Sequence, residues 1–176
     1  QLSQAISFVT QDNFLFDCSL KENIRLGKPD ASDEEVLAAA RAAQCEEFLA
    51  RLDRGWDTPA GEAGKQLSGG ERQRLFIVLA LIPQPELVFL DELTTGLDAK
   101  ARRSVWKTLE SLKEQGLTIF LTSHFMDEVE ALCDEICILR KGVPVFRGTV
   151  EQAKARCGCQ RFEDAYLHLS EEETDR

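Results

Sequence analysis

Two short apolar runs, separated by a helix-length segment, constrain the fold of this chain most strongly. Residues 87–90 (LVFL) and 118–122 (TIFLT) each have the length of a buried strand. Between them, Asp98 can cap a helix that carries Val105, Leu109 and Leu112 on one face. Strand, helix and strand in this order form a crossover unit, so the two strands are parallel. Because unbroken apolar runs are typical of strands covered on both faces, we predict an α/β fold around a buried parallel sheet.

The segment from residue 18 to residue 66 is predicted to be mainly helical. Ser32 and Glu35 have the spacing of a capping box, and apolar residues follow at helical intervals. A second helix is expected from Glu46 to a stop at Gly55, and a third spans residues 70–82 before Pro83.

The two ends of the chain carry weaker signals. Residues 6–9 (ISFV) are expected to form a strand. After a helix that contains Met126, residues 136–139 and 143–146 are expected to form two strands around a Lys-Gly turn. We expect the last ten residues to be a frayed tail.

Composition excludes several classes of protein. The net charge is −10 and no Lys/Arg block occurs, which argues against a nucleic-acid-binding protein. The longest apolar run, residues 75–83, is far shorter than the ~20 residues of a membrane span. The six cysteines are scattered, and Cys157 and Cys159 lack zinc-site spacing, so we expect reduced thiols. Because the chain starts at Gln1, we expect a fragment or an excised domain.

Polar side chains follow both predicted strands directly. Asp91 and Glu92 follow the first strand, and Ser123 and His124 follow the second. Ligands of parallel sheets gather beyond the carboxyl ends of the strands, so these side chains are expected to share one crevice. An acid that holds a metal beside an acid that takes a proton from water is a phosphoryl-transfer arrangement. Two alternatives stay open: the acids cap the following turn, and His124 begins a helix.

A glycine pair begins the helix that precedes the first of these strands. Gly69 and Gly70 would let another backbone approach, and the free amides of a helix start favour an anion. Ser68 and Glu71 have capping-box spacing, which explains the same residues structurally. The two interpretations are compatible, because a capped helix end can still receive a phosphate.

These motifs together resemble the ATP-binding cassette (ABC) ATPase family. Residues 67–74 (LSGGERQR), 87–92 (LVFLDE), 94–98 (TTGLD) and 122–124 (TSH) match the family in order and interval. Residues 9–12 (VTQD) resemble its Q-loop. The resemblance implies a partial P-loop NTPase (RecA-like) core with a parallel sheet, plus an α-helical ABC signature subdomain.

The resemblance also implies a division of the chain. Residues 1–17 would be the Q-loop region of the core, and residues 18–74 the helical signature subdomain. Residues 75–150 would be the second half of the core, and residues 151–176 a C-terminal helix and tail.

The resemblance implies catalytic roles for four residues. Gln11 would contact Mg²⁺ and the attacking water, and Asp91 would hold Mg²⁺ through water. Glu92 would orient or deprotonate the attacking water, and His124 would contact the γ-phosphate of ATP.

The remaining motif residues would bind nucleotide across a dimer. The signature residues Ser68, Gly69, Gly70 and Glu71 would contact ATP held by a second cassette in a head-to-tail arrangement. Asp98 would lie at the same interface. The resemblance therefore implies ATP and Mg²⁺ as cofactors, and a second cassette as partner.

By this resemblance the chain is the ATP-hydrolysing domain of a membrane transporter, most consistent with an exporter. It would bind a transmembrane domain or subunit at the cytoplasmic face of a membrane, and no nucleic acid. One alternative is a non-transport ABC ATPase. Another is a non-catalytic, mosaic or engineered cassette fragment, because residues before about 75 and after about 86 resemble different transporter groups.

The phosphate-binding loop of the family is absent from this sequence. Its Gly-x-x-x-x-Gly-Lys-Ser/Thr pattern supplies the amides and the lysine that cradle phosphates. The two Gly-Lys pairs, at Gly27 and Gly64, lack both the preceding glycine and the following hydroxyl. In the family this loop lies upstream of the Q-loop, so it would have preceded Gln1. We therefore expect the chain alone not to bind ATP.

Overall fold

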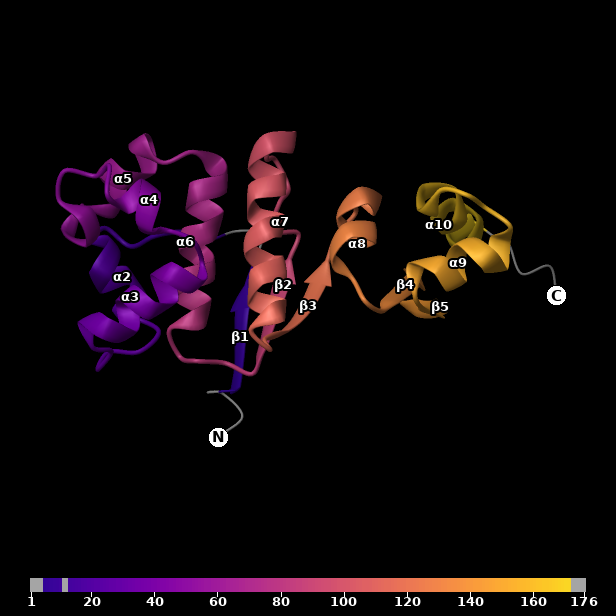
Figure 1. Ribbon diagram of the computed structural model, residues 1–176, viewed down its shortest axis with the longest axis horizontal. Helices are drawn as coiled ribbons and strands as arrows, with labels where there is room; N and C mark the ends of the chain where they lie inside the picture. Colours follow the sequence, from indigo (N-terminus) through magenta and orange to yellow (C-terminus); the bar gives the residue numbers. More distant parts are fainter. Residues whose placement is uncertain (1–4, 11–12, 172–176) are drawn as a thin grey trace. The chain divides into compact units, whose positions relative to one another are not determined.

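The structure is a computed structural model that describes residues 5–10 and 13–171. The chain divides into two compact units, residues 1–122 and 123–176, which are described separately below (Figure 1). This division falls inside the predicted segment 75–150, and the four-part division made from the sequence stays a prediction.

The first unit contains the predicted parallel sheet. Strands β1 (Ile6–Val9), β2 (Leu87–Asp91) and β3 (Thr118–Thr122) lie in the order β1-β2-β3, and both pairings are parallel. The register places Asp91 opposite Thr122 at the carboxyl ends of β2 and β3. The predicted α/β class and the parallel sheet are confirmed.

The prediction that this sheet is covered on both faces is wrong. Val88 and Leu90 are buried on one face, whereas Phe8 and Phe120 on the other face are 66% and 54% exposed. Their rings lie 4.9 and 5.0 Å from the ring of Phe89, which stands between them in register. The second face is therefore a row of three phenylalanines that shield one another.

Helices make up most of the remainder of the first unit, as predicted for residues 18–66. They are α2 (Leu20–Arg25), α3 (Asp33–Ala42), α4 (Glu46–Leu49), the short 3₁₀ helix η1 (Gly55–Asp57), α5 (Ala60–Gln66), α6 (Gly69–Leu81) and α7 (Ala99–Glu114). The helix expected from Glu46 to Gly55 ends early at Leu49. The amides of Arg51 and Leu52 bond three residues back instead of four, which tightens the chain into turns.

The predicted helix caps explain where the longer helices begin. Ser32 and Glu35 form a reciprocal capping box at α3, and Asp98 accepts a hydrogen bond from the amide of Ala101 at α7. Helices α6 and α7 lie side by side (Figure 1). The predicted apolar face of α7, including Val105 and Leu109, is buried.

The second unit consists of helices around an antiparallel hairpin. Its elements are α8 (Met126–Leu132), β4 (Ile136–Arg140), β5 (Val143–Gly148), α9 (Val150–Cys157) and α10 (Phe162–Glu171). Lys141 and Gly142 join the two strands with φ angles of 49° and 80°, the left-handed pair that a two-residue hairpin turn requires.

The prediction of a frayed tail is wrong for residues 167–171. Helix α10 continues to Glu171 because Leu169, only 3% exposed, packs in a core with Phe146, Val150 and Phe162. Residues 172–176 lie outside the described residues. Over the described part of the chain, no helix has both the length and the apolar character of a membrane span.

Candidate functional site

The two acids at the end of β2 are fixed to the end of β3. The amide of Glu92 donates hydrogen bonds to the carbonyl oxygen of Thr122 at 3.1 Å and to its hydroxyl at 3.2 Å. The Thr122 hydroxyl in turn donates to Oδ1 of Asp91. Residues 91, 92 and 122 therefore form one hydrogen-bonded chain at the carboxyl edge of the sheet, where the sequence predicted a ligand site.

The backbone turns sharply at Glu92. Its φ angle of 47° is in the left-handed region, which is uncommon for a residue with a long side chain. The amide of Thr95 donates to the carbonyl oxygen of Glu92 at 3.0 Å, and the Thr95 hydroxyl lies 3.5 Å from Oε2 of Glu92. The turn after β2 is thus closed by the backbone of Glu92, while its carboxylate is held beside Thr95.

The capping box predicted at the start of α6 is present. The Ser68 hydroxyl accepts from the Glu71 amide at 3.3 Å, and the Ser68 amide donates to Oε2 of Glu71 at 2.8 Å. Arg51 forms an ion pair with Oε1 of the same carboxylate. Partial burial opposes ionisation of Glu71, but the Ser68 hydrogen bonds and the charge of Arg51 outweigh it and lower the Glu71 pKa. Both carboxylate oxygens of Glu71 have partners within the chain, and its predicted contact with ATP stays a prediction.

The glycine pair of α6 packs closely against the segment that follows the acids. A Cβ at Gly69 would lie 2.8 Å from Cδ2 of Leu97, and one at Gly70 would lie 3.2 Å from Cβ of Ala101. The sequence suggested that these glycines admit a phosphate or another chain. In the structure they also let α6 approach residues 97–101 of the same chain.

One cavity of about 490 Å³ brings several predicted motifs together. Gly69 lies in its wall with Thr95, Gly96 and Leu97 from the turn that follows the two acids. Its remaining walls are formed by Ala60, by Arg72, Gln73 and Phe76 of α6, and by Asn13, Phe14 and Leu15 of the segment after the predicted Q-loop. The signature helix and the turn after β2 therefore face one space within the first unit.

Three further predicted site residues are found at positions 11, 98 and 124. Gln11 lies outside the described residues. Asp98 is exposed and caps α7, accepting from the Ala101 amide at 2.8 Å. His124 belongs to the second unit, where it is exposed and its ring centre lies 4.2 Å from that of Phe125. The catalytic roles of Gln11 and His124 and the interface role of Asp98 stay predictions.

Sequence reasoning assigned no structural role to Asn23, which organises the segment after the predicted Q-loop. Asn23 is 1% exposed. Its Oδ1 accepts from the Phe16 amide at 2.7 Å, and its Nδ2 donates to the carbonyl oxygens of Phe16 at 3.1 Å and Ser19 at 2.9 Å. One feature of the sequence could have indicated this role: an asparagine stands between Leu20 and Ile24, on the apolar side of a short helix.

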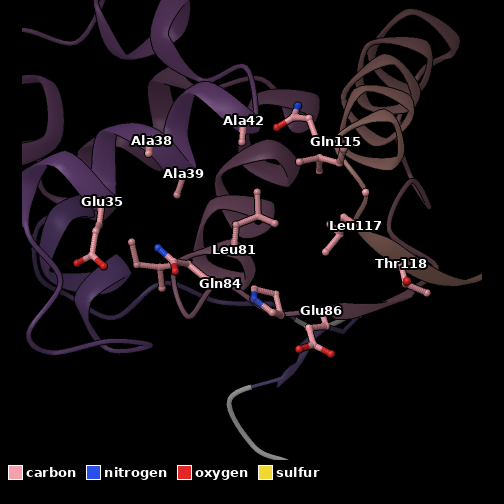
Figure 2. A pocket seen from close by; sticks show the side chains of 14 residues that line it. Glu35, Ala38, Ala39, Ala42, Leu81, Gln84, Glu86, Gln115, Leu117 and Thr118 are labelled. Carbon is pink, nitrogen blue, oxygen red and sulfur yellow. The ribbon is translucent and has the colours of Figure 1, made fainter.

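A second cavity, of about 530 Å³, lies at the amino ends of β2 and β3 (Figure 2). Alanines of α3 and leucines of α6 and α7 form its apolar floor, and five polar residues stand around it: Glu35, Gln84, Glu86, Gln115 and Thr118. Because it opens at the opposite edge of the sheet from Asp91 and Glu92, it is not the site predicted from the sequence.

The described residues of the first unit supply few protein ligands for a metal ion. Across the described residues, no group of three or more His, Cys, Asp or Glu side chains is arranged to hold a metal ion. Asp91 and Glu92 are two adjacent carboxylates only. Such a pair suits an ion that takes one or two carboxylates and completes its shell with water and substrate phosphates, as Mg²⁺ does.

The chain is similar to known proteins of one family. The family model described as ABC transporter matches residues 1–95. The chain is 40% identical to heavy metal tolerance factor 1 of Caenorhabditis elegans over 157 residues, covering 89% of this chain and 19% of that protein. It is also 40% identical to the Beta-(1-->2)glucan export ATP-binding/permease protein NdvA of Rhodopseudomonas palustris, covering 89% of this chain and 26% of that protein.

The fold is similar to a solved structure of a bacterial Atm1-family ABC exporter with ATP bound. The TM-score is 0.76 at 31% identity, over 98% of this chain and 29% of that chain. The chain therefore spans only about a fifth to three tenths of the length of the proteins that it matches. With a family model that covers more than half of its residues, the chain belongs to the ABC transporter family.

Proposed function

We propose that the chain is part of the nucleotide-binding domain of an ABC exporter, where it supplies the hydrolytic residues and the signature helix of an ATPase. The observation that carries the proposal is the hydrogen-bonded chain from Glu92 through Thr122 to Asp91 at the carboxyl edge of the parallel sheet. It orients the Asp91 carboxylate and anchors the backbone of the neighbouring Glu92. Positioned carboxylates are what metal-assisted phosphoryl transfer requires of a protein.

Asp91 fits the role of holding Mg²⁺. Its carboxylate is exposed and its Oδ1 is already oriented by the Thr122 hydroxyl. Carboxylate oxygens and water are the ligands that Mg²⁺ prefers, with nucleotide phosphates completing the shell. When bound, the ion would neutralise charge on the phosphates.

Glu92 fits the role of the base that positions water. It is half-buried, its backbone is fixed at both N–H and C=O, and Thr95 lies beside its Oε2. A carboxylate held in this way can accept a proton from an attacking water. A positioned base of this kind contributes roughly 10²–10⁴ in rate.

The start of α6 fits the role of a phosphate contact for a second cassette. Gly69 lies in the wall of the 490 Å³ cavity, and the amides and dipole of a helix start favour an anion. Asp98 is exposed on the adjacent loop, as a residue of a head-to-tail interface must be before assembly. ATP bound by the partner cassette would therefore be contacted by Ser68, Gly69 and Gly70.

The segment after the predicted Q-loop supports a transmembrane partner. Phe14 and Phe16 are 69% and 54% exposed, and their rings form an edge-to-face pair 5.1 Å apart. Asn23 holds the backbone of Phe16 in place. A fixed pair of exposed aromatic rings is suited to receive an apolar segment of a membrane domain at the cytoplasmic face.

Magnesium dependence of ATP hydrolysis tests this proposal. In the full-length protein, Asp91→Asn should raise the Mg²⁺ concentration for half-maximal hydrolysis by roughly 10–100-fold. Asp53→Asn, which changes an exposed loop carboxylate outside the site, should leave it unchanged. Equal magnesium dependence in wild type and Asp91→Asn, or no ATP hydrolysis by the full-length protein, would refute the proposal.

The chain alone is expected not to bind Mg-ATP, because its sequence contains no phosphate-binding loop. Calorimetric titration of residues 1–176 should show no binding at micromolar nucleotide. Joined to a segment that supplies that loop, the same residues should bind.

A further inference from the structure

The loop between α9 and α10 places one thiol beside an imidazole, and a second cysteine precedes that thiol by two residues. Cys157 is the last residue of α9, Gly158 follows with a left-handed φ of 66°, and Cys159 comes next. The Sγ of Cys159 lies 3.4 Å from Nδ1 of His168 in α10. The Cys159 amide donates to the carbonyl oxygen of Lys154 at 3.0 Å, which fixes the position of this residue.

We propose that Cys159 is the nucleophilic thiol of a reversible disulfide switch, with His168 as its proton acceptor and Cys157 as its resolving thiol. All six cysteines of the chain carry free thiols in the structure. Cysteine nucleophiles of this kind are partly exposed and lie beside a basic group. Cys159 and Cys157 are both half-buried at the surface, and His168 is exposed.

The reaction uses a low-molecular-weight disulfide, such as oxidised glutathione, as oxidant. Nδ1 of His168 accepts the Cys159 proton, and the thiolate attacks one sulfur of the glutathione disulfide. A Cys159–glutathione bond forms, the glutathione S–S bond breaks, and the departing thiolate takes the proton from His168. Cys157 then attacks Sγ of Cys159 and releases the second glutathione, which takes the Cys157 proton. Two cysteine thiols are oxidised and one glutathione disulfide is reduced to two thiols.

The backbone between the two thiols can accommodate the product. Cysteines separated by one residue have Cα atoms at most about 7 Å apart, and a disulfide takes Cα–Cα separations up to about 6.8 Å. Gly158 adopts left-handed and extended conformations without a side-chain penalty, so the turn can adjust while α9 stays intact. The Sγ of Cys157 lies 3.8 Å from the carbonyl oxygen of Ala165, which is a weak contact for a thiol.

Cys137 provides an internal reference for reactivity. It is more exposed than Cys159, lies on β4, and belongs to the same unit. If access alone decided the rate, Cys137 would react with an alkylating reagent first. If His168 activates its neighbour, Cys159 reacts first in spite of its lower exposure.

The test measures the alkylation rate of each cysteine in residues 1–176 by peptide mass spectrometry at neutral pH. Cys159 should react about tenfold or more faster than Cys137. His168→Gln should remove that advantage, and His124→Gln, which changes the other histidine, should preserve it. With oxidised glutathione, the wild type should form the Cys157–Cys159 disulfide, whereas Cys157→Ser should stop at one bound glutathione. Equal rates at Cys159 and Cys137, or an advantage that survives His168→Gln, would overturn the proposal.

Discussion

Gly69 and Leu97 approach so closely that a single methyl group on Gly69 would lie 2.8 Å from Cδ2 of Leu97. Leu97 belongs to the turn that follows Asp91 and Glu92, and Gly69 begins the signature helix α6. The turn that follows the two acids and helix α6 are therefore packed against one another within one chain. Close-packed side chains leave no room for independent movement, so a displacement of either element would also displace the other.

Replacing Gly70 by a residue with a larger side chain should destabilise the first unit. Gly70→Val adds a branched side chain 3.2–3.4 Å from Ala101, including its backbone, and overpacking of this kind costs about 1–3 kcal/mol. Gly61 in α5 has no atom within 4 Å of an added Cβ, so Gly61→Ala should instead stabilise by roughly 0.5 kcal/mol. Urea unfolding of both variants measures the difference. An unchanged free energy of unfolding in Gly70→Val would show that α6 and α7 separate without cost.

The Glu71 carboxylate should stabilise the start of α6 in a pH-dependent way. Its pKa is lowered from 4.5, so its contribution is present above that value and is lost as the pH falls through the lower folded pKa. Glu71→Ala should cost about 1 kcal/mol near neutral pH, and this difference should shrink in acid. Glu71→Gln keeps the capping oxygen but loses the Arg51 ion pair, so its cost should be smaller. A cost for Glu71→Ala that is constant from pH 7 to pH 3 would contradict this account.

Much of the fold followed from local patterns. The capping boxes at Ser32 and Ser68, the cap at Asp98 and the apolar runs of β2 and β3 are decided by residues close in sequence, and each is present. The length of α10 could not be read in this way, because it depends on Leu169 reaching a core supplied by β5 and α9.

The position of the two acids of the candidate site could be predicted from the sequence, but the packing contacts around them could not. Residues that follow parallel strands meet at one edge, and the structure has Asp91 and Glu92 at the carboxyl edge of the sheet, bonded to Thr122. The crevice shared with His124 stays a prediction. The close contact of Gly69 with Leu97 depends on how two distant segments pack, and no local pattern encodes that distance. The sequence wrongly predicted that the face with Phe8, Phe89 and Phe120 is covered, because an apolar run does not show which face of its strand is buried.

Removal of the Asn23 amide should loosen the segment after the predicted Q-loop. Asn23→Ala would leave the N–H and C=O of Phe16 without this partner, and we expect a loss of about 2–3 kcal/mol in the free energy of unfolding. The other asparagine, Asn13, is only half-buried, so Asn13→Ala should cost less than about 0.5 kcal/mol. Amide hydrogen exchange at Phe16 should accelerate in Asn23→Ala only. Unchanged exchange there would mean that other contacts hold this segment.

Cys45 should be inert to thiol reagents while the chain is folded. It is fully buried, and desolvation raises its pKa from 9.0 to about 12. Below pH 9 its neutral thiol contributes stability, which should be lost as the pH rises from 9 towards 12, because only the unfolded chain ionises there. Alkylation followed by mass spectrometry should label Cys45 in urea but not in buffer. Labelling in buffer at the rate of exposed Cys137 would contradict its burial.

The most direct test of the account is single-turnover ATP hydrolysis by the full-length protein carrying Glu92→Gln. Glutamine keeps the shape and the backbone bonds of residue 92 but cannot take a proton, so the hydrolysis step should slow by roughly 10²–10⁴ while ATP affinity changes little. Glu110→Gln, at an exposed position on α7, should hydrolyse at the wild-type rate. Hydrolysis by Glu92→Gln at the wild-type rate would contradict the central claim that the acids at the end of β2 perform the chemistry.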